Sequence, residues 1–208
     1  MKIILSRLFL CFLLYWVLSL ASVTSAAVAP SVASPENSQV IEWTNVINAY
    51  PDNAVPYVKR GLIYNSLKQF DLAINDFTRA IDLNPKYAIA YNNRAYSYGR
   101  QERYDLALKD LTKSIEIDPS NARSYVLRAI IYNRNKQYDL AITDCNKGIE
   151  LDPQFLLAYM TKGSALEFKI MYPEAIETYN KIIANASPKD KDMVESAKFK
   201  IRNLGGTF

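Results

Sequence analysis

Residues 88–121 read AIAYNNRAYSYGRQERYDLALKDLTKSIEIDPSN, and the same pattern occurs before and after them at a period of 34 residues. Three rows of residues mark this period: Tyr57, Tyr91, Tyr125 and Tyr159; Ala73, Ala107, Ala141 and Ala175; and Pro51, Pro85, Pro119 and Pro153. A fixed period of this length is typical of arrays of stacked supersecondary units. Four complete units run from residue 54 to residue 189.

Each unit is predicted to be a pair of short helices joined by a turn. In the first half of the first unit, Tyr57, Gly61 and Tyr64 share one helical face, and Ala73 and Phe77 share one in the second half. The proline after each second half ends the helix, because the residue before a proline avoids helical geometry. The small residues that leave room for bulky ones on the facing helix are Gly61, Ala95, Ala129 and Gly163.

These rows of residues resemble the tetratricopeptide repeat (TPR) family, whose motif has an aromatic residue, a small residue, Tyr, Ala, an aromatic residue and Pro at a period of about 34. The resemblance implies an all-α, right-handed TPR solenoid of four helix-turn-helix repeats. The repeats are expected at residues 54–87, 88–121, 122–155 and 156–189, with the fourth degenerate. An N-terminal orphan helix within residues 35–53 and a C-terminal capping helix at residues 190–204 are expected to close the array.

The first 26 residues are predicted to be a signal peptide. Lys2 and Arg7 precede an apolar core from Leu8 to Leu20, and small residues lead to a cleavage site after Ala26. The alternative is an uncleaved anchor, in which residues 1–29 hold the protein to a membrane. Residues 27–34 are expected to form a flexible tether. The sequence thus predicts an exported protein, periplasmic or secreted, or a membrane-anchored one in the alternative.

The composition argues against catalysis, metal binding and nucleic-acid binding. The chain has no His and two Cys, which excludes His-dependent catalytic constellations and a thiolate zinc site. Its 25 Lys and Arg nearly balance its 21 Asp and Glu, so little electrostatic drive toward nucleic acid remains. We therefore expect no enzyme activity, no cofactor, no metal site and no nucleic-acid partner.

A row of arginines is matched by a row of aspartates 16 residues later: Arg60 with Asp76, Arg94 with Asp110, and Arg128 with Asp144. Folding each hairpin about its turn brings the members of a pair to equal height. We predict partly buried, bidentate ion pairs with a structural role. The alternative is a ladder of arginines that grips an acidic ligand.

The TPR resemblance implies a superhelix whose concave wall is built by the first helix of each repeat. An apolar wall of this kind is a candidate groove for a peptide or a partner domain. The residues expected in this groove are Val58, Leu62, Asn65, Asn92, Tyr96, Arg100, Arg123, Val126, Ile130, Asn133 and Met160. The alternative is that these side chains only line a tightly wound interior.

Some TPR domains clamp a terminal carboxylate, but only Asn93 and Arg123 match the places involved, so no such clamp is predicted.

The function predicted from the sequence is an exported, non-catalytic scaffold or adaptor that binds a protein or peptide in the concave groove, within an envelope assembly or secretion complex. One alternative is a structural homo-oligomer that uses the same apolar wall. A less favoured alternative is an enzyme or sugar-binding protein built on the Tyr-rich surface.

Overall fold

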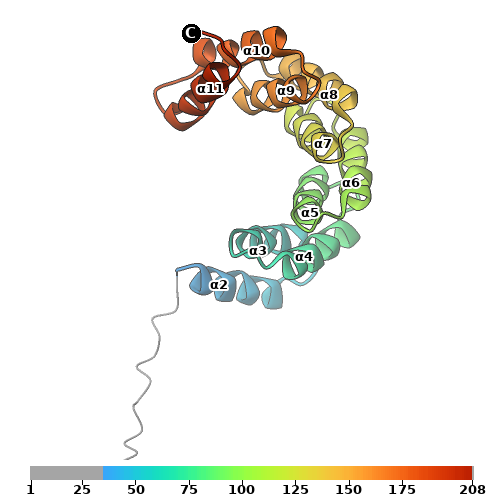
Figure 1. The fold of residues 1–208 in the computed structure, drawn as a ribbon. Coiled ribbons are helices and arrows are strands. Elements are labelled where there is room, and N and C mark those ends of the chain that lie inside the picture. The colour runs from blue at the N-terminus through green and yellow to red at the C-terminus, as the bar shows by residue number, and fades with distance from the viewer. Residues whose placement is uncertain (1–34, 208) are drawn as a thin grey trace, which may run out of the picture. The chain divides into compact units, whose positions relative to one another are not determined.

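The computed structural model describes residues 35–207, of which residues 39–207 form one compact unit. The described residues fold into ten helices and contain no strand (Figure 1). The predicted all-helical array is therefore confirmed. The predicted signal peptide and tether, residues 1–34, lie outside the described residues. From residue 35 to residue 207, no helix is long and apolar enough to cross a bilayer.

Eight of these helices form four hairpins. The first helices of the hairpins are α3 (Ala54–Ser66), α5 (Ala88–Arg100), α7 (Ala122–Arg134) and α9 (Leu156–Phe168). The second helices are α4 (Phe70–Leu83), α6 (Tyr104–Ile117), α8 (Tyr138–Leu151) and α10 (Tyr172–Asn185). Helix α2 (Pro35–Ala49) precedes the hairpins, and α11 (Lys191–Asn203) follows them.

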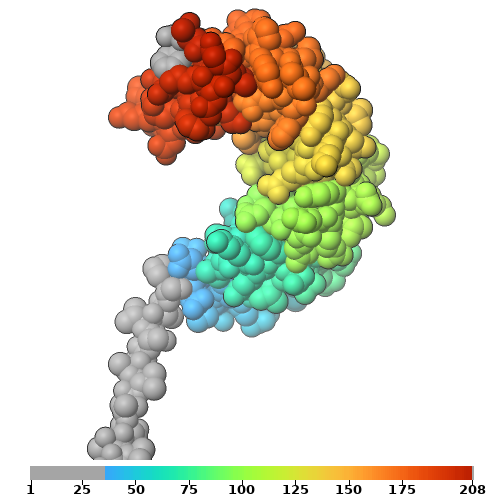
Figure 2. Space-filling view, in the orientation of Figure 1, coloured from blue at the N-terminus to red at the C-terminus, as the bar shows by residue number. Residues whose placement is uncertain are grey.

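Successive hairpins pack in series, so each repeat borders the next along the chain (Figure 2). The first helices also contact one another, α3 with α5, α5 with α7, and α7 with α9. Among the described residues, consecutive second helices make no contact of similar extent. We call the surface of α3, α5, α7 and α9 the first-helix wall.

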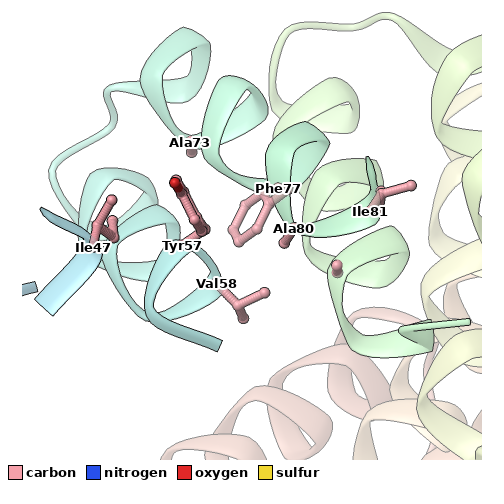
Figure 3. Packing of buried hydrophobic residues seen from close by; sticks show 8 residues of the cluster. Ile47, Tyr57, Val58, Ala73, Phe77, Ala80 and Ile81 are labelled. Carbon is pink, nitrogen blue, oxygen red and sulfur yellow. The ribbon is translucent and has the colours of Figure 1, made fainter. Parts of the chain in front are cut away.

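The core of each hairpin sets a large side chain against a small residue. In the first hairpin, Phe77 lies between α3 and α4 beside Tyr57 (Figure 3). A Cβ atom on Gly61 would come within 2.7 Å of Cε1 of Phe77, so the close-packed interior admits the ring only opposite a glycine. The other hairpins pair Gly163 with Tyr179, Ala95 with Leu111, and Ala129 with Cys145.

One hydrogen bond joins the tyrosine row to the proline row. The hydroxyl of Tyr57 donates to the carbonyl oxygen of Pro51 at 3.0 Å. The same bond recurs from Tyr91 to Pro85, from Tyr125 to Pro119 and from Tyr159 to Pro153, at 3.4, 3.3 and 3.1 Å. Each bond ties the start of a first helix to the turn that precedes it, which explains why both rows keep the same period.

The turn inside each hairpin contains one residue in the left-handed region. These residues are Lys68, Glu102, Lys136 and Ile170, with φ of 59°, 60°, 59° and 62°. This conformation is costly for any residue with a Cβ atom and most costly for a β-branched one. Ile170 therefore carries the most backbone strain of the four.

Candidate functional site

Three bidentate ion pairs lie inside the hairpins. In the first hairpin, Arg60 Nε donates to Asp76 Oδ2 at 2.8 Å, and Nη2 donates to Oδ1 at 2.7 Å. These hydrogen bonds raise the pKa of Arg60 above its usual value. Arg94 with Asp110 and Arg128 with Asp144 repeat the geometry at 2.7 to 2.9 Å. Because the aspartates are buried, the carboxylates of their own hairpins already occupy these guanidinium groups.

A threonine completes each ion pair, and the sequence analysis did not anticipate it. Nη1 of each arginine donates to a threonine Oγ1 on the preceding helix of the array, at 3.0, 3.0 and 3.3 Å for Thr44, Thr78 and Thr112. These threonines stand 16 residues before the arginines. This constant separation is the sequence feature from which the contact could have been predicted. The arginine therefore links its own hairpin to the helix before it, and this supports a structural role.

The structure gives the exposure of every residue that was expected on the first-helix wall. Leu62, Tyr96, Arg100 and Arg123 are exposed, and Asn65, Ile130, Asn133 and Met160 are half-buried. Three others are buried, which corrects their expected placement on an open surface: Val58, Asn92 and Val126 are 3%, 4% and 0% exposed. They occupy one slot of the repeat that turns toward the neighbouring first helix instead of toward solvent. Val58, for example, packs in the same buried cluster as Ala90 of α5.

The contacts between neighbouring first helices follow a pattern at the α3–α5 junction. Its N-terminal half is apolar, where Val58 and Ala90 share a cluster. Its C-terminal half is polar, where Ser97 Oγ donates to Asn65 Oδ1 at 2.7 Å. The α7–α9 junction is similar, because Val126 is buried in its N-terminal half and Asn133 Nδ2 donates to the Thr161 carbonyl at 2.9 Å.

The α5–α7 junction reverses this pattern. Its N-terminal half is polar, because Asn92 Nδ2 donates to Ser124 Oγ at 2.8 Å. In its C-terminal half, Gly99 and Ile131 stand where the α3–α5 junction has Asn65 and Ser97. A Cβ atom on Gly99 would lie 2.6 Å from Cδ1 of Ile131. The isoleucine side chain therefore occupies the space that a side chain at position 99 would need. The C-terminal half of this one junction is therefore apolar.

A pocket of about 570 Å³ opens at this apolar part of the first-helix wall. Its apolar lining includes Leu111, Leu127, Ile130, Ile131 and Leu157, together with the ring of Tyr96. Three arginines also line it, Arg100, Arg123 and Arg134, and no acidic residue does. A largely apolar pocket with a few charged groups is the usual character of a ligand site.

Arg100 is held in place by two aromatic side chains. Its Nη1 donates to the hydroxyl of Tyr96 at 2.9 Å, and its guanidinium lies over the rings of Phe70 and Tyr96, 5.2 and 5.8 Å from their centroids. Such cation–π contacts restrict the side chain without neutralising its charge. The position of the Arg100 guanidinium is therefore restricted while its positive charge is kept.

Comparison with known sequence families finds profiles that match parts of the repeat array. Residues 88–121 and 122–155 match the profile described as tetratricopeptide repeat. Residues 61–102 match a second profile, described as TPR repeat. Residues 61–155 of this chain therefore contain tetratricopeptide repeats. A search of curated proteins finds no matching sequence.

Solved structures with the same fold include several TPR proteins. A crystal structure of MamA superimposes with a TM-score of 0.65 at 24% identity, over 73% of this chain and 89% of that one. YrrB, described as a TPR protein with an unusual peptide-binding site, gives a TM-score of 0.59 at 20% identity, over 78% and 84% of the two chains. The first TPR of Spaghetti (RPAP3), bound to an HSP90 peptide, gives 0.55 at 21% identity, over 57% and 94%.

The TPR fold is that of a protein-interaction scaffold. TPR modules are generally non-catalytic, and in this structure the buried aspartates Asp76, Asp110 and Asp144 are engaged in the hairpin ion pairs. From residue 35 to residue 207, no group of three or more acidic or Cys side chains is placed to hold a metal ion. The pocket at the α5–α7 junction, which we call the wall pocket, is thus the best candidate for a functional site in the described part of the chain.

Proposed function

We propose that this protein is an exported, non-catalytic TPR scaffold or adaptor that binds a protein or a peptide on its first-helix wall. The observation that carries the proposal is the apolar pocket at the α5–α7 junction, lined by three arginines and by no acid. YrrB and the RPAP3 domain are TPR proteins whose descriptions name peptide binding, and this supports the same class of ligand here.

The first-helix wall as a whole supports the proposal because it exposes large apolar side chains. Val55, Leu62, Ile89 and Tyr96 on α3 and α5 are 43%, 40%, 50% and 38% exposed. Apolar residues gathered on one surface of a soluble domain commonly mark a binding site. A partner that covers them would gain about 25 cal/mol for each Å² of apolar surface removed from water.

Export is proposed from the N-terminal sequence alone, with an envelope assembly or secretion complex as the setting. Cell fractionation of the protein carrying a C-terminal tag tests this, together with the intact mass of the recovered chain. A chain that begins after Ala26 supports signal-peptide cleavage, whereas a full-length chain in the membrane fraction supports the uncleaved anchor. A full-length chain in the cytosol would refute export.

Site-specific crosslinking in cells tests the binding wall. A photoreactive amino acid is placed at Leu62, Tyr96 or Ile130, and at Thr143 as a control, since Thr143 is an exposed residue of the second helix α8. We expect a discrete crosslinked product from the wall positions and none from the control. A product that contains two copies of this chain would instead support the homo-oligomer, and equal products from all four positions would refute the wall as the binding surface.

A further inference from the structure

We infer that the wall pocket takes one bulky apolar side chain of an extended peptide whose acidic residues flank that side chain. This inference rests on the proposed function, because it names the ligand class of the same wall. It concerns an internal segment of a partner and not a terminal carboxylate.

The apolar part of the ligand follows from the reversed α5–α7 junction. At the α3–α5 junction the Asn65 and Ser97 side chains bond to each other in the wall, so an apolar ligand group there would have to displace a hydrogen bond. At the α5–α7 junction Gly99 brings no side chain, and Ile131 presents hydrocarbon in place of the serine hydroxyl. A peptide side chain can therefore enter against Ile131, Leu127 and Leu157 without leaving a polar group unpaired.

The acidic part of the ligand follows from the charges of the wall. Helices α3, α5 and α7 contain no Asp or Glu. Their paired arginines use aspartates of the second helices, so those charges are already balanced. Within residues 35–207, Arg100, Arg123 and Arg134 form no ion pair with a carboxylate, and all three are exposed. Acidic side chains on a peptide would supply the missing partners.

The spacing of the arginines sets the spacing of the acids. Arg123 lies in the first turn of α7 and Arg134 is its last residue, 11 residues later. At about 1.5 Å per residue the two positions are roughly 16 Å apart. An extended peptide advances about 3.3 Å per residue, so acids about five residues apart reach both arginines. The apolar residue then lies between them, over the pocket.

Synthetic peptides provide the test. The probe is Gly-Glu-Ser-Ser-Phe-Ser-Glu-Gly, with blocked ends so that no terminal carboxylate is present. One comparison peptide replaces Phe by Ser, and another replaces both Glu by Gln. Each is titrated into the isotopically labelled protein, and binding is followed by NMR, which measures weak affinity and reports which residues respond. We expect each comparison peptide to bind at least ~10-fold more weakly than the probe, equivalent to about 1.4 kcal/mol.

Two variants address the two halves of the inference. Gly99→Asn combined with Ile131→Ser copies the Asn65 and Ser97 pair into the α5–α7 junction, so it makes the apolar floor of the pocket polar with a hydrogen bond that the fold already uses. Arg123→Glu reverses one flanking charge. Lys109→Glu on α6 is the matched control, because it makes the same change in net charge on an exposed residue outside the pocket. We expect a loss of at least ~10-fold in probe affinity for the first two and less than ~2-fold for the control.

The outcomes separate this inference from the proposed function. Loss of binding in both pocket variants, with a folded NMR spectrum, supports the inference. Equal affinity for all three peptides, or shifts confined to residues away from Tyr96, Leu127 and Ile130, overturns it. If the wall crosslinks a partner while the acidic probe fails to bind, the proposed function stands and only the ligand class is wrong. If neither occurs, both fail.

Discussion

Replacing Asp110 by Asn should destabilise the protein by about 3 kcal/mol. Asp110 accepts hydrogen bonds from Nε and Nη2 of Arg94 at 2.7 and 2.8 Å, and the amide keeps the shape while removing the charge. Breaking a buried ion pair by removing one partner costs about 3–5 kcal/mol, because the remaining charge stays uncompensated. The side chains of Arg94 and Asp110 are 16% and 7% exposed, so some water reaches the arginine. We therefore expect the lower end of that range.

Urea denaturation followed by circular dichroism measures this loss, since guanidinium chloride would screen the ion pair that is being tested. Asp105→Asn on the same helix is the control, because Asp105 is exposed, and it should change stability by less than about 0.5 kcal/mol. The fourth repeat has Lys162 and Thr178 in these two slots. Changing Arg94 to Lys together with Asp110 to Thr should therefore cost less than the sum of the two single changes. A loss below about 1 kcal/mol for Asp110→Asn would refute the reasoning, because the pair would then behave as a surface one.

Three further predictions follow from particular side chains. Val126→Asp should cost more than about 3 kcal/mol, because it puts a carboxylate at a site that is 0% exposed, whereas Leu62→Asp should be tolerated; thermal unfolding of the two variants decides this. Ile170→Gly should stabilise the protein by about 1 kcal/mol in urea, because its φ is 62° and the side chain is 71% exposed; a loss of stability would contradict the strain argument. Burial raises the pKa of Cys145 from 9.0 to about 12, so its thiol should resist alkylation at pH 8 until the protein unfolds, as read by intact mass. Rapid alkylation of the native protein would show instead that Cys145 is accessible. Because the pKa of Cys145 is higher in the folded state than in the unfolded state, the protein should also lose stability as the pH rises above about 9.

The size of the facing residue bears on whether the small slot of each repeat holds Gly or Ala. The small slot of the repeat holds Gly in the first and fourth hairpins and Ala in the second and third. The structure shows that the glycines face the rings of Phe77 and Tyr179. The alanines share clusters with Leu111 and with Cys145. In the first, second and fourth hairpins the glycine or alanine therefore matches the size of the residue that faces it, whereas the third hairpin pairs two small residues, Ala129 and Cys145.

The candidate site was only partly predictable. Helical phase placed Leu62, Tyr96 and Arg123 on the open surface, and they are exposed. It placed Val58 and Val126 there as well, although both are buried. Phase on an isolated helix describes only the direction of a side chain, whereas burial depends on how closely the next first helix approaches. The pocket was not predicted for the same reason, since Arg134 and Leu157 come to it from different repeats.

The amino-acid sequence alone determined the number of repeats, the hairpin architecture and the aspartate partners of the half-buried arginines. Contacts within a hairpin recur at a constant separation along the chain, so a periodic sequence records them. The tertiary structure decided which junction between first helices is apolar and where the wall is hollow. Those features depend on two residues from different repeats, such as Gly99 and Ile131, whose combined volume and polarity matter only when the helices are packed together.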